Sequence, residues 1–376
     1  MSDAPLAGMA EAPSLRSDPP PVKVLILGTG LVAQRHVDSY TASGRAHVVA
    51  AAEPDAERRN AFCELNGIPE RYASLDEALN AGTFDAVSNA TPDAVHHATT
   101  MRALEAGKHV FCEKPLALSY PLAAEMAQAA QSRGLVNMVN LTYRQGGAIH
   151  EARRLVESGA IGEVRHVNAR YLQSWLVGNH WGTWHDTPAW LWRLSVGHGS
   201  TGTLGDVGIH ILDYASFGSA SEIIGLTCQL RTFPKAPGDR IGEYRLDAND
   251  TFVMLVDFDN GALGTVQATR YATGHSNDVM LEIYGTAGGL RVHGDTFWSS
   301  LETCLGANVH TQRWIPREFT PAPTLFAEFA RAIQDGTGEG PDFARGATLQ
   351  RLIDAGMTRG TGRSIPPVAD AAPPTG

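Results

Sequence analysis

The sequence predicts an α/β protein of two domains, in which a doubly wound parallel sheet is followed by an α+β domain with a large, mainly antiparallel open sheet. Three observations support this fold class. The 376 residues exceed what one ordinary hydrophobic core organises. Short apolar runs alternate with helical patterns in the first part of the chain, as in parallel sheets covered by helices on both faces. The later part contains longer strand patterns and a hairpin signal.

The strand–helix alternation occupies residues 22–142, which we assign to the first domain. Its apolar runs predict buried strands, and the segments between them have helical periodicity. The predicted strands are residues 22–27, 47–52, 84–89, 109–112 and 136–140, and the predicted helices are residues 55–66, 76–81, 94–106 and 120–133.

The second domain is predicted at residues 143–367. Its hairpin signal is Asn260-Gly261, which separates two strand patterns. The predicted strands are residues 162–175, 251–258, 262–271, 279–284 and 289–293, and the predicted helices are residues 148–158, 206–217, 325–334 and 346–358.

Composition excludes several classes of partner. Acidic residues outnumber basic ones, 40 against 30, and no basic block occurs, so a nucleic-acid partner is not expected. No apolar run approaches the ~18 residues of a membrane helix. Scattered cysteines without a CxxC pair predict neither a disulfide framework nor a zinc site, and they indicate reduced thiols in the cytoplasm. The cysteines are Cys63, Cys112, Cys228 and Cys304.

Both ends of the chain are expected to lie outside the folded domains. Residues 1–21 are rich in Ala and Pro and lack the continuous apolar stretch of a secretory signal, so we interpret them as a disordered tail. Residues 368–376 are interpreted as a flexible tail.

A glycine turn follows the first predicted strand and opens a helix. The segment Gly28-Thr29-Gly30-Leu31-Val32-Ala33 has the pattern G-x-G-x-x-A. Gly28 permits the tight turn, Gly30 allows the backbone to approach a pyrophosphate, and the small Ala33 allows close packing of helix on strand. The helix N-terminus faces the phosphates. These features predict a dinucleotide-binding Rossmann domain.

Glu53, at the end of the second strand, is the acidic residue expected after such a turn. A carboxylate there accepts hydrogen bonds from the adenosine ribose and repels a 2′-phosphate, which favours NAD over NADP. Glu53 could instead end its strand in solvent, and Arg58-Arg59 could weaken the preference, so NADP stays possible.

Further motifs resemble the Gfo/Idh/MocA family, named after glucose–fructose oxidoreductase and inositol dehydrogenase. The resemblance extends from Val22 to about Pro367. It is carried by the glycine turn, Asn89-Ala90-Thr91-Pro92-Asp93 with His96, Glu113-Lys114-Pro115, and Gly202-Thr203-Leu204-Gly205-Asp206-Val207-Gly208-Ile209-His210.

The resemblance implies a catalytic site. Lys114 is similar to the family's catalytic lysine, His210 to its general acid/base, and Asp206 to the residue that orients the substrate hydroxyl. The positions that the resemblance and the glycine turn assign to the cofactor are Gly28, Thr29, Gly30, Leu31, Val32, Glu53, Thr91, Pro92, His96, Glu113 and Lys114. Two positions depart from the family pattern, Ala33 for the third glycine and Ser200-Thr201 within the usual glycine run before the catalytic helix.

The residues themselves are compatible with this assignment. Asp206 and His210 are spaced i, i+4, so on a helix they share one face. Histidine titrates near neutrality and can exchange the hydroxyl proton, and the ammonium of Lys114 can stabilise a developing alkoxide. Alternatively, Asp206 caps the helix, His210 lies on a solvated face, and Lys114 is a salt-bridge partner.

Five tryptophans occur between residues 175 and 192, with histidines and an aspartate among them. Aromatic faces stack on sugar rings, but tryptophan is also enriched at subunit interfaces, and both alternatives stay open. The histidines have no metal-ligand spacing, so no metal is expected. The candidate substrate residues are Tyr143, Arg144, Trp175, Trp192, Arg193 and Asp206.

Together these features predict an NAD(P)-dependent oxidoreductase that oxidises a secondary hydroxyl of a sugar, inositol or related polyol. The resemblance further implies a homodimer or homotetramer. Two alternatives are an NAD-retaining enzyme that cleaves glycosides or eliminates through transient oxidation, and a non-catalytic sugar or cofactor sensor.

Overall fold

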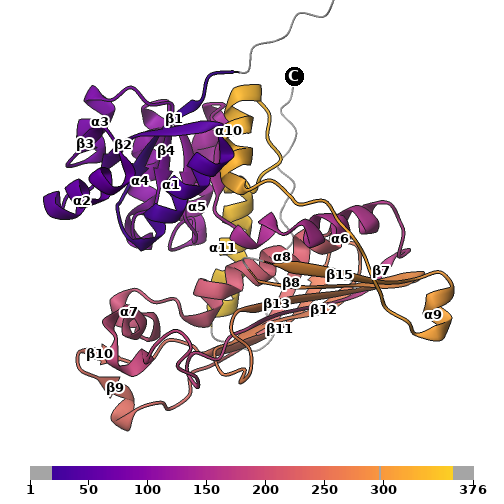
Figure 1. Ribbon diagram of the computed structural model, residues 1–376. Coiled ribbons are helices and arrows are strands. Elements are labelled where there is room, and N and C mark those ends of the chain that lie inside the picture. The colour runs from indigo at the N-terminus through magenta and orange to yellow at the C-terminus, as the bar shows by residue number, and fades with distance from the viewer. Residues whose placement is uncertain (1–18, 296–297, 359–376) are drawn as a thin grey trace, which may run out of the picture.

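The computed structural model describes residues 19–295 and 298–358, which form two domains in contact (Figure 1). The predicted fold class is confirmed, because a parallel sheet is followed by a larger, mainly antiparallel sheet. Most of the tail expected at residues 1–21, and all of that at residues 368–376, lie outside the described residues. Among the described helices, none is long and apolar enough to cross a bilayer.

The first domain is a doubly wound sheet of six parallel strands in the order β3-β2-β1-β4-β5-β6. Apart from Lys23, all residues of the two central strands, Val22–Leu27 and Ala86–Asn89, are buried, as in sheets covered by helices on both faces. The strands are β1 (Val22–Leu27), β2 (Ala46–Ala52), β3 (Glu70–Tyr72), β4 (Ala86–Asn89), β5 (His109–Cys112) and β6 (Asn137–Val139). The helices are α1 (Leu31–Ser43), α2 (Ala56–Asn66), α3 (Leu75–Ala81), α4 (His96–Glu105) and α5 (Tyr120–Ser132).

The edge strand β3 was not predicted from the sequence. Its three residues, Glu70-Arg71-Tyr72, have no apolar pattern, and only pairing with β2 makes them a strand. Short edge strands of this kind carry too few residues for a periodic signal.

The second domain contains an eight-stranded sheet in the order β16-β15-β14-β13-β7-β12-β11-β8. All neighbours are antiparallel except β7 and β12. The predicted hairpin at Asn260-Gly261 joins β11 to β12, with Gly261 at φ 84°. The strands are β7 (Val164–Leu172), β8 (Ile223–Arg231), β11 (Thr251–Phe258), β12 (Leu263–Thr269), β13 (Asp278–Gly285), β14 (Gly288–Gly294), β15 (Ser299–Leu305) and β16 (Ile315–Pro316), with α9 (Ala307–Thr311) before β16.

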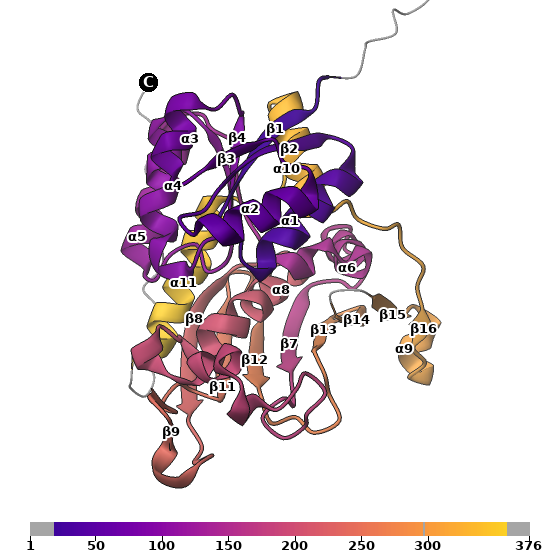
Figure 2. The same cartoon turned by 60° about the vertical axis from the view of Figure 1, so that its left-hand side comes forward.

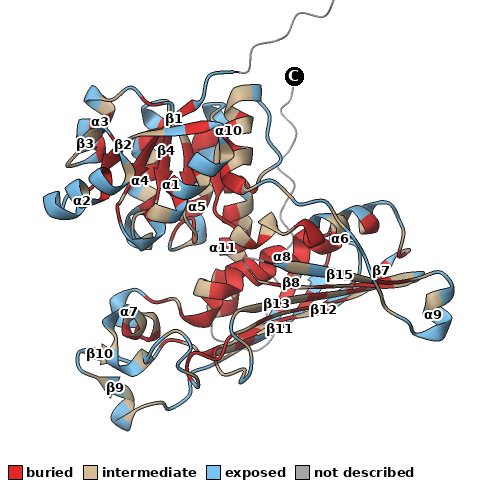
Figure 3. Ribbon diagram, viewed as in Figure 1, coloured by how far each residue is buried: buried red, intermediate tan, exposed pale blue. Residues whose placement is uncertain are grey.

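Two helices, α6 (Gly147–Glu157) and α8 (Ile209–Ser219), lie between this sheet and the first domain (Figure 2). All eleven residues of α8 are buried, because β7, β12 and β13 contact it on one side and α6 and α11 on others (Figure 3). Its polar residues are buried together with its apolar ones, among them His210 and Asp213.

A π-helical turn, Leu204–Gly208, precedes α8. The sequence predicted one regular helix over residues 206–217. The structure differs from this prediction, because the helix begins with a π-turn, whose hydrogen bonds span five residues instead of four. A π-turn rotates the residues before it relative to those after it, and such turns are frequent at functional sites. Asp206 lies within this turn and His210 lies just after it.

The last two helices return to the first domain. α10 (Leu325–Asp335) packs on α1 and β1, and its Phe326 and Phe329 belong to the same hydrophobic cluster as β1. α11 (Phe343–Met357) packs mainly on α5 and also contacts β8 (Figure 1). The sequence placed both helices in the second domain, at residues 143–367. Both helices nevertheless pack on elements of residues 22–142, because apolar faces are completed by spatial neighbours, whatever their order in the chain.

The tryptophan-rich segment forms a small unit at the end of the large sheet. It includes α7 (Pro188–Leu191) and the hairpin of β9 (Arg240–Ile241) and β10 (Tyr244–Arg245). Trp175, Leu191 and Leu246 are buried in its own hydrophobic cluster, against which Trp181, Trp184 and Trp190 pack.

Candidate active site

A pocket lies where the two domains meet. Asp93, Lys114 and Pro115 line it from the first domain, beyond the carboxyl ends of β4 and β5. Ligands of doubly wound folds bind at this edge of the sheet. The residues that line the pocket from the second domain are Trp192, Arg193, Gly199, Ser200, Thr201, Asp206 and Arg270.

The glycine turn lies after β1, and α1 begins at Leu31, as predicted. Gly28 has φ 84°, and a Cβ there would lie 3.0 Å from the Ala90 carbonyl oxygen. At Gly30 a Cβ would meet nothing within 4 Å. Leu31 is exposed, whereas Ala33 is fully buried against the sheet. The N-terminus of α1 is therefore open to a phosphate group, as the dinucleotide prediction requires.

Glu53 is hydrogen-bonded to this turn. Its carboxylate accepts hydrogen bonds from Thr29 N at 3.1 Å and from Arg58 Nη2 at 2.7 Å. Burial would raise the pKa of Glu53, but the bonds from Arg58 and from the amides of Thr29 and Asp55 lower it. Glu53 thus lies beside the turn, as predicted, and it is ionised; its contact with a ribose stays a prediction.

His96 connects two loops beneath the pocket. Its two ring nitrogens lie 2.8 Å from the carbonyl oxygens of Pro115 and Thr91. Two acceptors require that both nitrogens carry a proton. Burial would lower the pKa of His96, but Cys112 and the Pro115 carbonyl raise it to about 10. The imidazole therefore fixes the loop of Thr91 and Pro92 to the Lys114 loop.

Glu113 supports the neighbouring lysine through a buried network. It accepts hydrogen bonds from His36 Nε2 at 2.9 Å, from Asn140 Nδ2 at 2.6 Å and from Lys114 N at 3.2 Å. Burial would raise the pKa of Glu113, but His36, Asn140 and Lys114 lower it to about 2. His36 and Asn140 were not predicted. His36 lies on α1, so the network joins the helix of the glycine turn to the Glu113-Lys114 loop.

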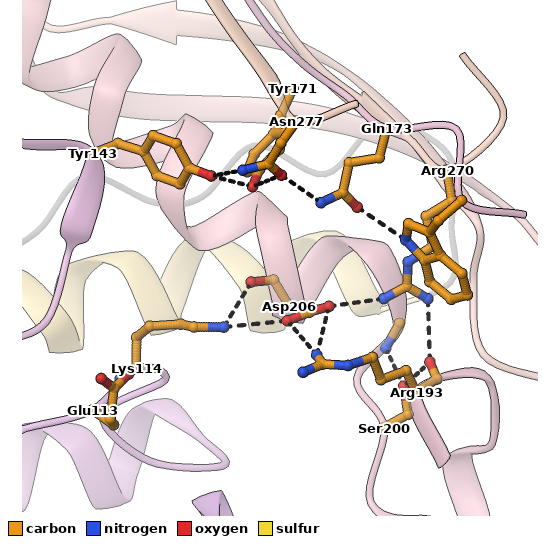
Figure 4. Close-up of polar contacts among 12 residues, drawn as sticks. Glu113, Lys114, Tyr143, Tyr171, Gln173, Arg193, Ser200, Asp206, Arg270 and Asn277 are labelled. Carbon is orange, nitrogen blue, oxygen red and sulfur yellow. Dashed lines mark hydrogen bonds and ion pairs between the residues drawn. The ribbon is translucent and has the colours of Figure 1, made fainter. Parts of the chain in front are cut away.

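Three cations converge on Asp206 (Figure 4). Lys114 Nζ lies 3.2 Å from Oδ1, Arg270 Nη2 lies 3.0 Å from Oδ2, and Arg193 Nη1 lies 3.1 Å from both oxygens. Burial would raise the pKa of Asp206, but the charges of Arg193, Lys114 and Arg270 hold it well below its usual range. Lys114 and Asp206 are therefore brought together as predicted.

Arg270 was missed by the sequence analysis. It is fully buried and also donates to the Arg193 carbonyl oxygen at 3.2 Å. The signal was present in the sequence, because Arg270 continues the alternation of buried positions Val266 and Ala268 along β12. An arginine in phase with a buried face needs an anionic partner, and Asp206 supplies it.

Tryptophan rings support both guanidinium groups. Arg270 Cζ lies 4.9 Å from the ring centre of Trp175, and Arg193 Cζ lies 4.7 Å from that of Trp192. These are cation–π distances. Trp192 also lines the pocket, whereas Trp175 is buried beneath Arg270. The remaining members of the segment, Trp181, Trp184 and Trp190, do not line this pocket.

His210 lies one helical turn beyond Asp206. It is buried, and its Nδ1 has no hydrogen-bond partner among the described residues. Burial, reinforced by the charge of Lys114, lowers the pKa of His210 to about 3. The imidazole is therefore neutral near pH 7. The ring of Tyr143 packs edge-on against it, with centroids 5.0 Å apart.

The Tyr143 hydroxyl belongs to a chain of hydrogen bonds that reaches the arginine cluster (Figure 4). Tyr143 and Tyr171 share a hydrogen bond, and Asn277 contacts both hydroxyls at 2.6 Å. The chain continues through Gln173 to Trp175, whose ring lies under Arg270. Tyr143 is thus brought to the site.

Arg144 lies away from the pocket. Its guanidinium makes two hydrogen bonds, of 2.6 and 2.7 Å, to the buried carboxylate of Asp213, and it lies over the ring of Phe217. Arg345 contacts the same carboxylate at 2.7 Å. The structure therefore places Arg144 in an ion-pair cluster behind α8, although the sequence analysis grouped it with the substrate residues.

Fold and site together define an oxidoreductase with an NAD-binding Rossmann domain. Comparisons with known proteins agree. Residues 22–141 match the model of an oxidoreductase family described as having an NAD-binding Rossmann fold, and residues 149–291 match that of the GFO/IDH/MocA C-terminal domain. The chain belongs to the Gfo/Idh/MocA family.

Similar proteins include several sugar dehydrogenases. Levoglucosan dehydrogenase of Pseudarthrobacter phenanthrenivorans is 26% identical over 89% of this chain and 95% of that protein. D-glucoside 3-dehydrogenase of Escherichia coli is 32% identical over 65% of this chain and 68% of that protein. The structure of levoglucosan dehydrogenase in complex with NADH and levoglucosan matches with a TM-score of 0.77, at 26% identity over 89% of this chain and 95% of the other.

Proposed function

We propose that this oxidoreductase oxidises a secondary hydroxyl of a sugar, inositol or related polyol, with NAD as the hydride acceptor. One observation carries the proposal: Lys114 of the first domain lies 3.2 Å from Asp206 of the second, and the buried His210 follows one helical turn after Asp206. The names of the similar proteins, which act on levoglucosan and glucosides, support a carbohydrate substrate.

The residues around the glycine turn fit a dinucleotide. The open space at Gly30 and the exposed start of α1 leave the helix N-terminus accessible to a pyrophosphate. Glu53 would face the adenosine ribose, and the loops of Thr91 and Lys114 would flank the nicotinamide. The bound cofactor supplies the hydride acceptor. The protein supplies the groups that accept the hydroxyl proton and stabilise the charge on the oxygen.

His210 is the proposed base. Because its imidazole is neutral near pH 7, it can accept the proton of the substrate hydroxyl. Lys114 has three ammonium protons, of which two are donated to the main-chain oxygen and to Oδ1 of Asp206. The third can stabilise the oxygen as its negative charge develops. Asp206 holds Lys114 in place, and burial of His210 excludes water.

Substitution of His210 by alanine tests this role. We expect turnover to fall by about 10²- to 10⁴-fold, while the affinity for NADH, measured by fluorescence titration, changes less than about 2-fold. His47→Ala is the matched control, because His47 is exposed on β2. Equal losses of turnover and NADH affinity would contradict the assignment.

The same assay distinguishes net oxidation from redox-neutral chemistry. Net oxidation of the hydroxyl produces one NADH for each product molecule, measured by nicotinamide absorbance and sugar analysis. Product without accumulated NADH would show instead that the enzyme retains its cofactor and uses transient oxidation. Absence of turnover with every sugar, despite tight NADH binding, would indicate a sensor.

We also propose that the enzyme works as a homo-oligomer in the cytoplasm. Apolar side chains on the sheet face opposite α8 support self-association: Val253 and Leu255 on β11 and Leu263 on β12 are 43, 56 and 52% exposed. The four free cysteines suit a reducing compartment. Light scattering should give a mass of two or four chains, and Leu255→Glu should reduce it.

A further inference from the structure

The carboxylate of Asp206 has no hydrogen-bonding capacity left for a substrate. Oδ1 accepts from Lys114 and Arg193, and Oδ2 accepts from Arg193 and Arg270. A carboxylate oxygen has two lone pairs, so these four contacts occupy all four positions. A substrate hydroxyl could donate to Asp206 only if a cation moved away.

The hydrogen-bonding groups around Asp206 that are still available to a ligand are donors. Lys114 retains one proton, as described above. Arg193 uses Nη1 for Asp206, while its Nη2 makes no hydrogen bond within the described part of the chain. The Arg193 side chain is 32% exposed, and it lines the pocket. Arg270, by contrast, is fully buried, so Arg193 and Lys114 are the donors that a ligand meets.

The pocket also has an excess of positive charge. Its lining includes Lys114, Arg193 and Arg270, opposed by Asp93 and Asp206. Burial raises the pKa of the Asp93 carboxyl group, and even with both carboxylates ionised the lining holds one more cation than anion. A negatively charged ligand group would restore the balance, and a partly desolvated guanidinium binds a carboxylate more strongly than a neutral hydroxyl.

The position of Arg193 suits such a group. The indole of Trp192 covers one face of the guanidinium and limits its access to water. Nη1 of Arg193 and Nζ of Lys114 both contact Oδ1 of Asp206, so the two cationic groups lie side by side. A ligand could therefore present a hydroxyl to Lys114 and a carboxylate to Arg193 at the same time.

We propose that the substrate is a sugar acid, such as a uronate or an aldonate, whose carboxylate is bound by Nη2 of Arg193. This inference rests on the proposed oxidation of a carbohydrate hydroxyl and names the substrate class for the same pocket. Arg193 is then the residue that determines specificity between acidic and neutral sugars.

Matched pairs of sugars test the proposal. NADH formation is followed with D-glucuronate against D-glucose, D-galacturonate against D-galactose, and D-gluconate against sorbitol. We expect kcat/KM to be at least about 10-fold higher for the acid of the preferred pair, since a guanidinium binds a carboxylate through two charged partners and a hydroxyl through only one. Added NaCl should raise KM for the acid more than for the neutral sugar.

Substitutions of Arg193 test whether this residue causes the preference for the acid. In Arg193→Gln the acid-to-neutral ratio of kcat/KM should fall toward one, whereas Arg193→Lys, which keeps the charge, should retain part of it. Arg245→Gln is the matched control, because Arg245 lies in the same small unit with a side chain 72% exposed. The control should leave the ratio unchanged, and thermal unfolding confirms that each variant is folded.

Binding measurements separate the two proposals. Calorimetric titration of the enzyme–NADH complex should give a dissociation constant at least about 10-fold lower for the acid. Equal affinities and equal kcat/KM within every pair would overturn the sugar-acid proposal but leave sugar oxidation intact. Tight, Arg193-dependent binding of the acid without any NADH formation would support the ligand class and refute the oxidation instead.

Discussion

Asp213 offers a direct test of the electrostatic interpretation of the domain contact. It lies on α8, three residues after His210, and is 2% exposed. Its carboxylate binds Arg144, which follows β6, and Arg345 on α11. The arginine side chains are 11 and 10% exposed. One carboxylate therefore connects α8 to two other elements, the segment after β6 and α11.

The magnitude follows from the pKa of Asp213. Burial would raise this pKa, but the charges of Arg144 and Arg345 lower it from 3.8 to about 2. At 1.36 kcal/mol per unit, the ionised carboxylate contributes about 2 kcal/mol. Replacement by asparagine also breaks the buried ion pair of Arg144, whereas Arg345 keeps Glu222 as a partner. Breaking a buried pair by removing one member typically costs about 3–5 kcal/mol. We expect Asp213→Asn to lower the free energy of unfolding by about 3 kcal/mol at pH 7.

The pH dependence has a definite sign. Because the folded-state pKa lies below the unfolded value, the stabilisation is complete above pH 3.8 and is lost as the pH falls toward 2. The difference between the wild type and Asp213→Asn should therefore shrink in acid.

Urea unfolding followed by tryptophan fluorescence measures this difference. All seven tryptophans lie at or after residue 175, so the signal reports on the domain that contains Asp213. Glu157→Gln is the matched control, since Glu157 lies on α6 in the same domain and pairs with Arg153 at 2.7 Å on the surface, where the two side chains are 49 and 38% exposed. This pair should contribute less than about 1 kcal/mol. An Asp213→Asn effect as small as the control, or one unchanged in acid, would refute the reasoning.

Three further predictions concern the site. Glu53→Ser should shift the kcat/KM ratio of NAD to NADP by about 10- to 100-fold toward NADP, because it removes a buried negative charge and releases Arg58. An unchanged ratio would contradict a cofactor role for Glu53. Glu113→Gln should lower the free energy of unfolding by about 3 kcal/mol at pH 7, since the carboxylate pKa is lowered from 4.5 to about 2. In thermal unfolding scans, the stability difference between the wild type and this variant should disappear as the pH falls from 4.5 toward 2. Arg270→Gln should reduce kcat by about 10-fold or more with little change in NADH affinity, because it removes one partner of Asp206; wild-type kcat would show that the other two cations suffice.

The sequence predicted those parts of the site that local patterns encode. The glycine turn, Glu53 and Lys114 each follow a strand at a fixed distance, and the strand endings place them at one edge of the sheet. Asp206 and His210 are four residues apart, so any helical conformation keeps them close. The π-turn between them was not predictable, because it depends on the packing around α8.

Contacts between distant residues required the tertiary structure. Arg270 lies 64 residues from Asp206, and His36 lies 77 residues from Glu113. Nothing in the local sequence of either carboxylate indicates which cation or imidazole it binds.

By itself, then, the sequence determined the fold class and the dinucleotide turn, and it predicted Lys114, Asp206 and His210 as the reactive groups, since short-range periodicity and strand endings specify these features. The tertiary structure decided that Asp206 is fully occupied by cations and that Arg193 presents its free donor to the pocket. The physical reason is that burial forces charged groups to find partners wherever the fold brings them within reach, and such partners are set by topology.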